Sequence, residues 1–268
     1  MGKYLIVDLV WEINFPQEFN QSRFEAFKTN DDAKEIHKIN FEIVDEIKKL
    51  ETTNYEEFGL KMYVENNTKL FDILNEQKQA IVRGKYINNT STYKILKGED
   101  LDLINILSFM RLTEIVAEHG VIALLASAVT INDQVIIPIK DNVDIFINKW
   151  LEELDNQKLI SNDKLFLKVE NNLVKVYSNP WSKTDNVQNV ALPMHSIVIL
   201  NKGKKSEFIE INEEEKLSNL VYNLGIMTDT LSNEALMEFC IDLLDRVNIF
   251  KYFGNIDIKE IFNKIYFN

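Results

Sequence analysis

The sequence predicts a mixed α/β fold, with a main domain over residues 99–268 and a smaller N-terminal α+β region over residues 1–98. The composition, 46% apolar and 27% charged over 268 residues, is that of an ordinary globular protein. Residues 121–131 form a continuous apolar run, which is typical of a strand buried on both faces. Strands, helices and hairpins then alternate without the regular rhythm of βαβ units, and this favours a mixed sheet.

The N-terminal region gives the weaker patterns. β-Branched and aromatic residues predict a strand over residues 3–13, with less regular candidates at residues 41–50 and 69–80. An Asn-Asn-Thr-Ser stretch predicts a turn between short strands at residues 80–85 and 92–96. The region is therefore interpreted as α/β or mostly β.

A helix is predicted over residues 99–120. Glu99 and Asp100 begin it and His119 lies in its last turn, so the charges at both ends suit the helix dipole. Gly120 ends the helix. The buried apolar strand follows directly.

Turn residues then separate a short strand from a second helix. The Asn-Asp pair at residues 132–133 predicts a turn before a strand over residues 135–139. Asp141 or Asn142 can cap the helix predicted over residues 143–154.

The last third is predicted to contain two hairpins and three helices. The first hairpin joins residues 164–169 to 173–178, and the second joins residues 196–200 to 207–211. The closing helices are predicted near residues 213–224, 232–248 and 257–266.

The net charge of −12 bears on the choice of partner. An acidic surface repels nucleic acid and anionic lipid, so we expect neither as a partner, whereas a basic peptide or protein would be attracted. The apolar runs are shorter than the roughly 18 residues of a membrane span, and the start lacks the pattern of a signal peptide. A cytoplasmic location is therefore expected.

The single cysteine and the histidines favour structural roles. Cys240 excludes an internal disulfide and lies in an apolar helical pattern, which predicts a small core residue. His119 and His195 lack the spacing of metal ligands, so no metal or cofactor is predicted.

Five segments of the C-terminal part resemble one family. They read HGVIALLASAVTI followed by QVIIP, then LISNDKLFLKV, KVYSNPW, LPMHSIVIL with KGKKSEF, and DRVNIFKYFGNIDIKEIF. Together they resemble the HPr serine kinase/phosphorylase family, which has a PEP carboxykinase-type kinase fold, and especially its small relatives in peptide-modification gene clusters. The resemblance covers roughly residues 119–268. It implies a kinase-like domain in that part of the chain.

The resemblance also implies a phosphate-binding P-loop after the second strand, and this chain departs from it. Residues 138–147 read PIKDNVDIFI, without the glycines, the lysine or the hydroxyl of that motif. The positions of those groups fall on Ile139, Asn142, Asp144, Ile145 and Phe146. Leu125 stands where the family has a histidine, and Asn162 where it has an aspartate. The chain is therefore interpreted as a degenerate member without a P-loop, a pseudokinase with no catalytic residues.

The segments that keep the resemblance supply the candidate binding residues. These are Asn162, Asp163, Pro180, Trp181 and Lys183, with Trp181 expected as an exposed aromatic anchor for a polypeptide. Two alternatives stay open: the Asn-Asp pair is an ordinary turn, and the tryptophan seals the edge of the sheet.

The favoured function is a binding protein for an intracellular protein or a precursor peptide, acting in peptide modification or as a regulatory subunit, as an oligomer or in complex with an active enzyme. The first alternative is an enzyme with a P-loop-free phosphotransfer site that uses Lys140, Asp163 or Lys183, although such chemistry needs cationic phosphate clamps. Ser127 and Ser182 would join that polar cluster at the strand ends, but Ser127 lacks a neighbouring base and is favoured as a packing residue. A structural subunit of a larger assembly is the second alternative.

Overall fold

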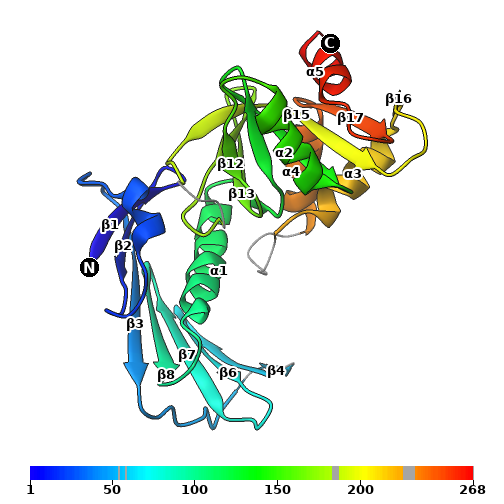
Figure 1. Ribbon diagram of the computed structural model, residues 1–268. Helices are drawn as coiled ribbons and strands as arrows, with labels where there is room; N and C mark the ends of the chain where they lie inside the picture. The colour runs from blue at the N-terminus through cyan, green and yellow to red at the C-terminus, as the bar shows by residue number, and fades with distance from the viewer. Residues whose placement is uncertain (54, 58, 183–186, 226–232, 268) are drawn as a thin grey trace. The chain divides into compact units, whose positions relative to one another are not determined.

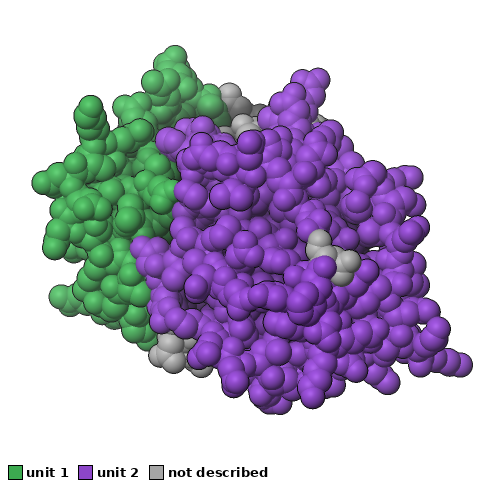
Figure 2. All heavy atoms as spheres, turned by 90° about the horizontal axis from the view of Figure 1, so that it is seen from above, with its two compact units in different colours: residues 1–111 green, residues 112–268 purple. Residues whose placement is uncertain are grey.

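The computed structural model describes residues 1–53, 55–57, 59–182, 187–225 and 233–267 (Figure 1). The chain divides into two units, residues 1–111 and residues 112–268 (Figure 2). This division falls inside helix α1 (Asp102–Glu118). The sequence places its domain boundary before that helix, at residues 98–99, and that boundary stays a prediction.

The first unit is built on an eight-stranded mixed sheet in the order β1-β2-β3-β8-β7-β6-β5-β4. Strands β2 and β3 are parallel, as are β3 and β8, and the other neighbours are antiparallel. The strands are β1 (Gly2–Ile6), β2 (Leu9–Asn14), β3 (Ile36–Val44), β4 (Tyr55–Glu57), β5 (Leu60–Glu65), β6 (Thr68–Leu74), β7 (Ala80–Ile87) and β8 (Thr90–Leu96), with a 3₁₀ helix η1 (Ser22–Phe27). The described part of residues 1–98 contains strands and a 3₁₀ helix but no α-helix, so it is mostly β and not the α+β region that the sequence suggests.

One strand predicted in this unit is instead a hairpin. Residues 3–13 turn back at Val7 and Asp8, whose φ angles of 54° and 59° are those of a tight two-residue turn. The sequence pattern missed this turn because valine is rare at positive φ. The hairpin predicted for residues 80–96 is confirmed as β7 and β8, which turn at Asn88.

Aromatic rings fill the core of the first unit. Phe15 and Phe41 stack with their ring centroids 6.0 Å apart, and Phe41 stacks on Tyr93 at 5.2 Å. His37 on β3 is buried against Trp11, with 5.0 Å between ring centroids.

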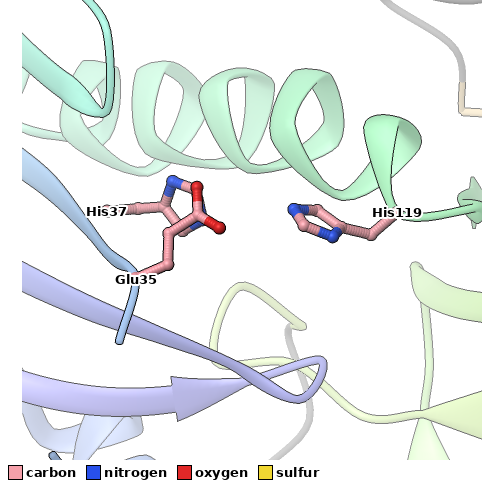
Figure 3. Close-up of side chains that lie close together, drawn as sticks. All are labelled: Glu35, His37 and His119. Atoms are coloured by element: carbon pink, nitrogen blue, oxygen red, sulfur yellow. The ribbon is translucent and has the colours of Figure 1, made fainter. Parts of the chain in front are cut away.

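The environment of His37 is drawn in Figure 3. Its Nε2 lies 3.9 Å from Oε1 of the exposed Glu35 (Figure 3). His119, also labelled there, follows α1 and belongs to the second unit. Within the first unit, the contact with Trp11 gives His37 a packing role.

The described residues of the second unit form a nine-stranded mixed sheet and four further helices. Its strands are β9 (Val121–Leu124), β10 (Ala128–Ile131), β11 (Gln134–Lys140), β12 (Leu159–Ser161), β13 (Leu165–Glu170), β14 (Leu173–Tyr177), β15 (Ala191–Asn201), β16 (Glu207–Ile209) and β17 (Asn248–Phe253). Its helices are α2 (Val143–Glu153), α3 (Glu213–Tyr222), α4 (Asn233–Leu244) and α5 (Ile258–Tyr266). The main path runs β12-β10-β11-β15-β14-β13-β9, and β17 and β16 lie beyond β15.

The central strands are buried on both faces, as a continuous apolar sequence predicts. Along β11, Val135, Ile137 and Ile139 face a core completed by Leu220 of α3 and residues of α4. Ile136 and its neighbours on β10 and β15 face a second core, which α2 and α5 complete. The sheet is therefore enclosed between two pairs of helices.

The strand predicted over residues 121–131 is interrupted. β9 pairs with β13, whereas β10 pairs with β11 and β12, so the two halves join different parts of the sheet. Between them the Leu125 N–H donates to the Asn223 carbonyl at 2.7 Å, and the Ser127 hydroxyl donates to the Asn162 carbonyl at 2.8 Å. These hydrogen bonds fix the chain between β9 and β10 outside either strand. The apolar run in the sequence is continuous, so it does not show where the strand is interrupted.

The second predicted hairpin is also wrong, because β17 separates its two arms. β17 pairs in parallel with β15 and antiparallel with β16, so the end of the chain lies beside β15 (Figure 1). The helix predicted for residues 232–248 accordingly ends at Leu244. The first hairpin, β13 and β14, is confirmed and turns at Asn171 and Asn172, both at positive φ.

The mixed α/β fold that the sequence predicts is confirmed, with two mixed sheets and few helices. Each described helix is too short or too polar to cross a lipid bilayer.

Candidate functional site

The connection between β11 and α2 is the turn at which the family resemblance implies a P-loop. Only Asp141 and Asn142 separate the strand from the helix. The Asp141 N–H donates to the Leu200 carbonyl at 3.1 Å, and its carboxylate accepts the Lys202 N–H at 3.3 Å. The turn is thus tied back onto the sheet.

This turn is unsuited to phosphate. A P-loop surrounds phosphates with backbone N–H groups at a helix N-terminus, where the helix dipole favours negative charge. Here Asp141 precedes α2 and Asp144 lies in its first turn, so two negative charges stand near the helix N-terminus and would repel an anion there. The side chain of the N-cap residue, Asn142, makes no capping hydrogen bond.

A cleft of about 260 Å³ opens beside this turn. Its walls come from residues 125–127 after β9, residues 138–140 at the end of β11, Val143 and Asp144 at the start of α2, and Asn162 and Asp163 after β12. Asn223, the residue after α3, completes the lining. We refer to this space as the strand-end cleft.

The structure brings together part of the predicted polar cluster in this cleft. Ser127, Lys140, Asn162 and Asp163 all line it. The Ser127 hydroxyl is engaged by the Asn162 carbonyl, which supports its interpretation as a packing residue. Lys140 is exposed and has a φ of 81°, a left-handed conformation that is costly for a residue with a Cβ.

Asp163 lies on the wall formed by residues 161–164. Its carboxylate is 3.6 Å from the Lys164 ammonium group. The Ser161 hydroxyl donates to the Lys164 carbonyl at 2.5 Å and accepts the Lys164 N–H at 3.1 Å. These local bonds make the wall a tight turn, so the turn interpretation of Asn162 and Asp163 describes their backbone correctly.

Trp181 is not the exposed anchor that the sequence suggests. Its side chain is only 3% exposed, and Pro180 is also buried. The backbone N–H of Trp181 donates to Oδ1 of Asn179 at 3.0 Å, and Asn179 Nδ2 donates to the Lys164 carbonyl at 2.8 Å. The Pro-Trp turn therefore supports the cleft wall from the interior.

Two further residues of the sequence prediction lie next to this support. Ser182 places its hydroxyl 3.0 Å from that of Ser161, which ties the Pro-Trp turn to the same wall. Lys183 lies outside the described residues.

Sequence reasoning missed the apolar side of the cleft. Leu125, seen in the sequence only as the replacement of a histidine, is 50% exposed. Its backbone pairs with Asn223, and the preceding residues of α3, Val221 and Tyr222, are exposed, Tyr222 at 89%. Exposure of the last turn of a helix cannot be recognised from its sequence, because valine and tyrosine at these positions fit a buried face equally well.

Cys240 and His195 lie apart from the lining of this cleft. Burial in the α4 core raises the pKa of the Cys240 thiol to about 11, so the group stays protonated, and its predicted core position is confirmed. Burial lowers the pKa of His195, whose Nδ1 lies 3.3 Å from the Ser196 hydroxyl.

Comparison with known proteins does not identify a function for the strand-end cleft. A scan against protein-family models finds no match, and a search of curated proteins finds none. Among solved structures, the chain matches the HPr(Ser) kinase/phosphatase from Coxiella burnetii with 11% sequence identity and a TM-score of 0.30, over 55% of this chain and 94% of that one. A likeness at this level carries no argument about activity, and the proposals below depend on the chain's own residues.

Proposed function

We propose that this chain is a polypeptide-binding protein of a kinase-like type that has no working phosphate site, and that it receives its partner at the strand-end cleft. The observation that carries this proposal is the two-residue connection between β11 and α2. Its backbone is bonded to the sheet, and Asp141 and Asp144 place negative charge where a nucleotide would need donors.

The size of the cleft favours an inserted side chain over a whole small molecule. Sites for drug-sized ligands and cofactors usually measure about 300–1,000 Å³. The strand-end cleft, at about 260 Å³, falls below that range. It is sufficient for one anchoring side chain of a polypeptide.

The surroundings of the cleft match the composition of protein interfaces. Binding energy in interfaces concentrates on a few aromatic and apolar side chains within a polar rim. Leu125 supplies an exposed apolar group in the lining, and the exposed Tyr222 directly precedes the lining residue Asn223, while Asn162 and Asp163 supply polar groups. In this proposal Trp181 contributes indirectly, because its turn fixes the position of the wall.

The enzymatic alternative has one observation in its favour, since Lys140 and Asp163 line the same cleft. Phosphoryl transfer, however, needs several cationic groups to hold the transferred phosphate. Among the described lining residues Lys140 is the one cation, and Asp144 and Asp163 accompany it. Binding without catalysis is therefore the better-supported function.

The experiment compares partner capture by two leucine variants of matched exposure. Leu125→Ala removes a 50% exposed side chain in the cleft, and Leu173→Ala removes a 53% exposed side chain at the β13–β14 turn. Parent and Leu173→Ala proteins are expected to capture the same intracellular partner, identified by mass spectrometry, whereas Leu125→Ala and Tyr222→Ala should lose it.

Melting temperature is the control for that experiment. None of the three variants should unfold, because both leucines are half exposed and Tyr222 is 89% exposed. Capture of the same partner by all four proteins, at equal stability, would remove the strand-end cleft from the binding surface.

A further inference from the structure

A second surface with the features of a docking site lies on α4, and it shares no lining residue with the strand-end cleft. Met237 and Ile241 are one helical turn apart and both are exposed, Ile241 at 52%. Beside them is a largely apolar groove of about 540 Å³, lined by Ala117, Ile122 and Phe239 among others. We call this surface the α4 groove.

The exposed apolar residues of α4 are additional to its packing face. Cys240 and Leu243 are fully buried in the core beneath the helix, and Leu236 packs against the same core. An amphipathic surface helix needs only one such stripe. Met237 and Ile241 lie off this stripe, so the fold of the unit does not account for them.

Charge around these residues restricts the possible occupant. Glu234 and Glu238 are exposed on the same face, one turn apart, and Asp245 continues the row beyond the end of the helix. Asp242, which also lines the groove, is paired with Arg246 at 2.5 Å. The apolar pair is thus bordered by carboxylates.

This border disfavours two occupants. A second copy of the chain docked through the same face would bring like carboxylates together, and each copy carries a net charge of −12. A membrane surface is disfavoured because anionic lipid repels the same carboxylates.

We infer that the α4 groove docks a basic amphipathic helix of a polypeptide partner. Apolar side chains of that helix, spaced three or four residues apart, would contact Met237, Ile241 and the groove. Its lysine or arginine side chains would face Glu234 and Glu238. This inference does not depend on the proposed function of the strand-end cleft, because the two surfaces use different residues.

The test uses a fluorescently labelled synthetic amphipathic peptide of about 18 residues, long enough for a stable helix when bound, with leucines on one face and lysines on its borders. Fluorescence anisotropy with the full chain is expected to give saturable binding. Ile241→Ser and Glu238→Lys should each weaken it by about tenfold, equivalent to about 1.4 kcal/mol. Leu173→Ser, which changes an exposed residue outside the groove, should leave it within about twofold.

Two further peptides separate this docking from general attraction to an acidic protein. A scrambled peptide of equal composition is expected to bind about tenfold more weakly, and a peptide with glutamate in place of lysine should not bind. Equal binding of the scrambled peptide, lack of saturable binding, or an Ile241→Ser protein with parental affinity would each overturn the inference.

Sedimentation of the chain alone tests whether a second copy of the chain occupies the α4 groove. The inference predicts that the parent and Ile241→Ser proteins sediment alike. A dimer of the parent that Ile241→Ser abolishes would assign the groove to a second copy and overturn the inference. Should Ile241→Ser fail to fold, Glu238→Lys keeps the peptide test decisive, because Glu238 is exposed and its substitution leaves the core intact.

Discussion

At the scale of single residues, the Pro-Trp turn at Trp181 supports the wall of the strand-end cleft from inside the protein and does not present the tryptophan to a partner. Hydrogen bonds of Asn179 and Ser182 join this turn to the Ser161–Lys164 turn, so the two turns support each other. The sequence could not tell an exposed tryptophan from a buried one. Burial depends on tertiary neighbours that no local pattern records.

Trp181→Ala is therefore expected to destabilise the protein. Removal of a buried tryptophan typically costs about 3–5 kcal/mol, because lost packing and a cavity add together. Chemical denaturation followed by circular dichroism measures this change in the free energy of unfolding. Exposed Leu173→Ala is the comparison and should change it by less than about 0.5 kcal/mol. A Trp181→Ala protein as stable as Leu173→Ala would show that the tryptophan is not part of the core.

Cys240 provides a second residue-scale prediction. Because it is fully buried and its pKa is raised to about 11, the reactive thiolate is scarce and shielded at neutral pH. A thiol-specific reagent at about pH 8 is expected to leave the native protein unmodified and to modify the denatured chain at its single cysteine. Rapid modification of the native protein would mean that α4 does not pack as described.

At the scale of elements, the sequence predicted most helices and the Asn-rich hairpin turns but not the pairing of distant strands. α2, α3 and α5 begin and end within a few residues of the predicted bounds, because caps and periodicity are local signals. The break at Leu125–Ser127 and the insertion of β17 beside β15 depend on contacts between segments far apart in sequence. The strand-end cleft exists because of that break, so its apolar side could not be predicted.

The position of β9 can be tested with adjacent leucines. Leu124 is buried in β9 and Leu125 is half exposed after it. Leu124→Asp is expected to cost several kcal/mol, because an unpaired charge enters the core, whereas Leu125→Asp should cost less than about 1 kcal/mol. Thermal melting of both variants measures the difference. Equal melting temperatures would show that the strand is misplaced.

The turn between β11 and α2 yields another prediction. Left-handed backbone costs an ordinary residue about 1–2 kcal/mol, and glycine avoids this cost while adding about 0.5–1 kcal/mol of chain entropy loss. Lys140→Gly is thus expected to raise the free energy of unfolding slightly, by up to about 1 kcal/mol. Lys140→Ala, which removes the same side chain but keeps the Cβ, should give no such gain.

Denaturant titration of both Lys140 variants checks this expectation. If Lys140→Gly is less stable than Lys140→Ala, the φ of 81° is not the conformation of this residue in solution.

At the scale of the whole molecule, the net charge of −12 and the two acidic residues around the β11–α2 turn oppose the same class of ligand. Nucleotide phosphates meet repulsion both at long range and at the turn itself. A basic polypeptide meets attraction at long range and exposed apolar groups at short range. The two surfaces proposed for binding are thus consistent with one kind of partner.

The proposed absence of a phosphate site predicts that this chain does not bind nucleoside triphosphates, and calorimetric titration with ATP and Mg²⁺, then with GTP and Mg²⁺, tests this most directly. Lys140→Ala serves as the matched variant, since it removes the one cation among the described lining residues of the cleft. The account predicts no saturable heat in the micromolar range for either protein. A Kd below about 10 µM, near −7 kcal/mol, for the parent would contradict it.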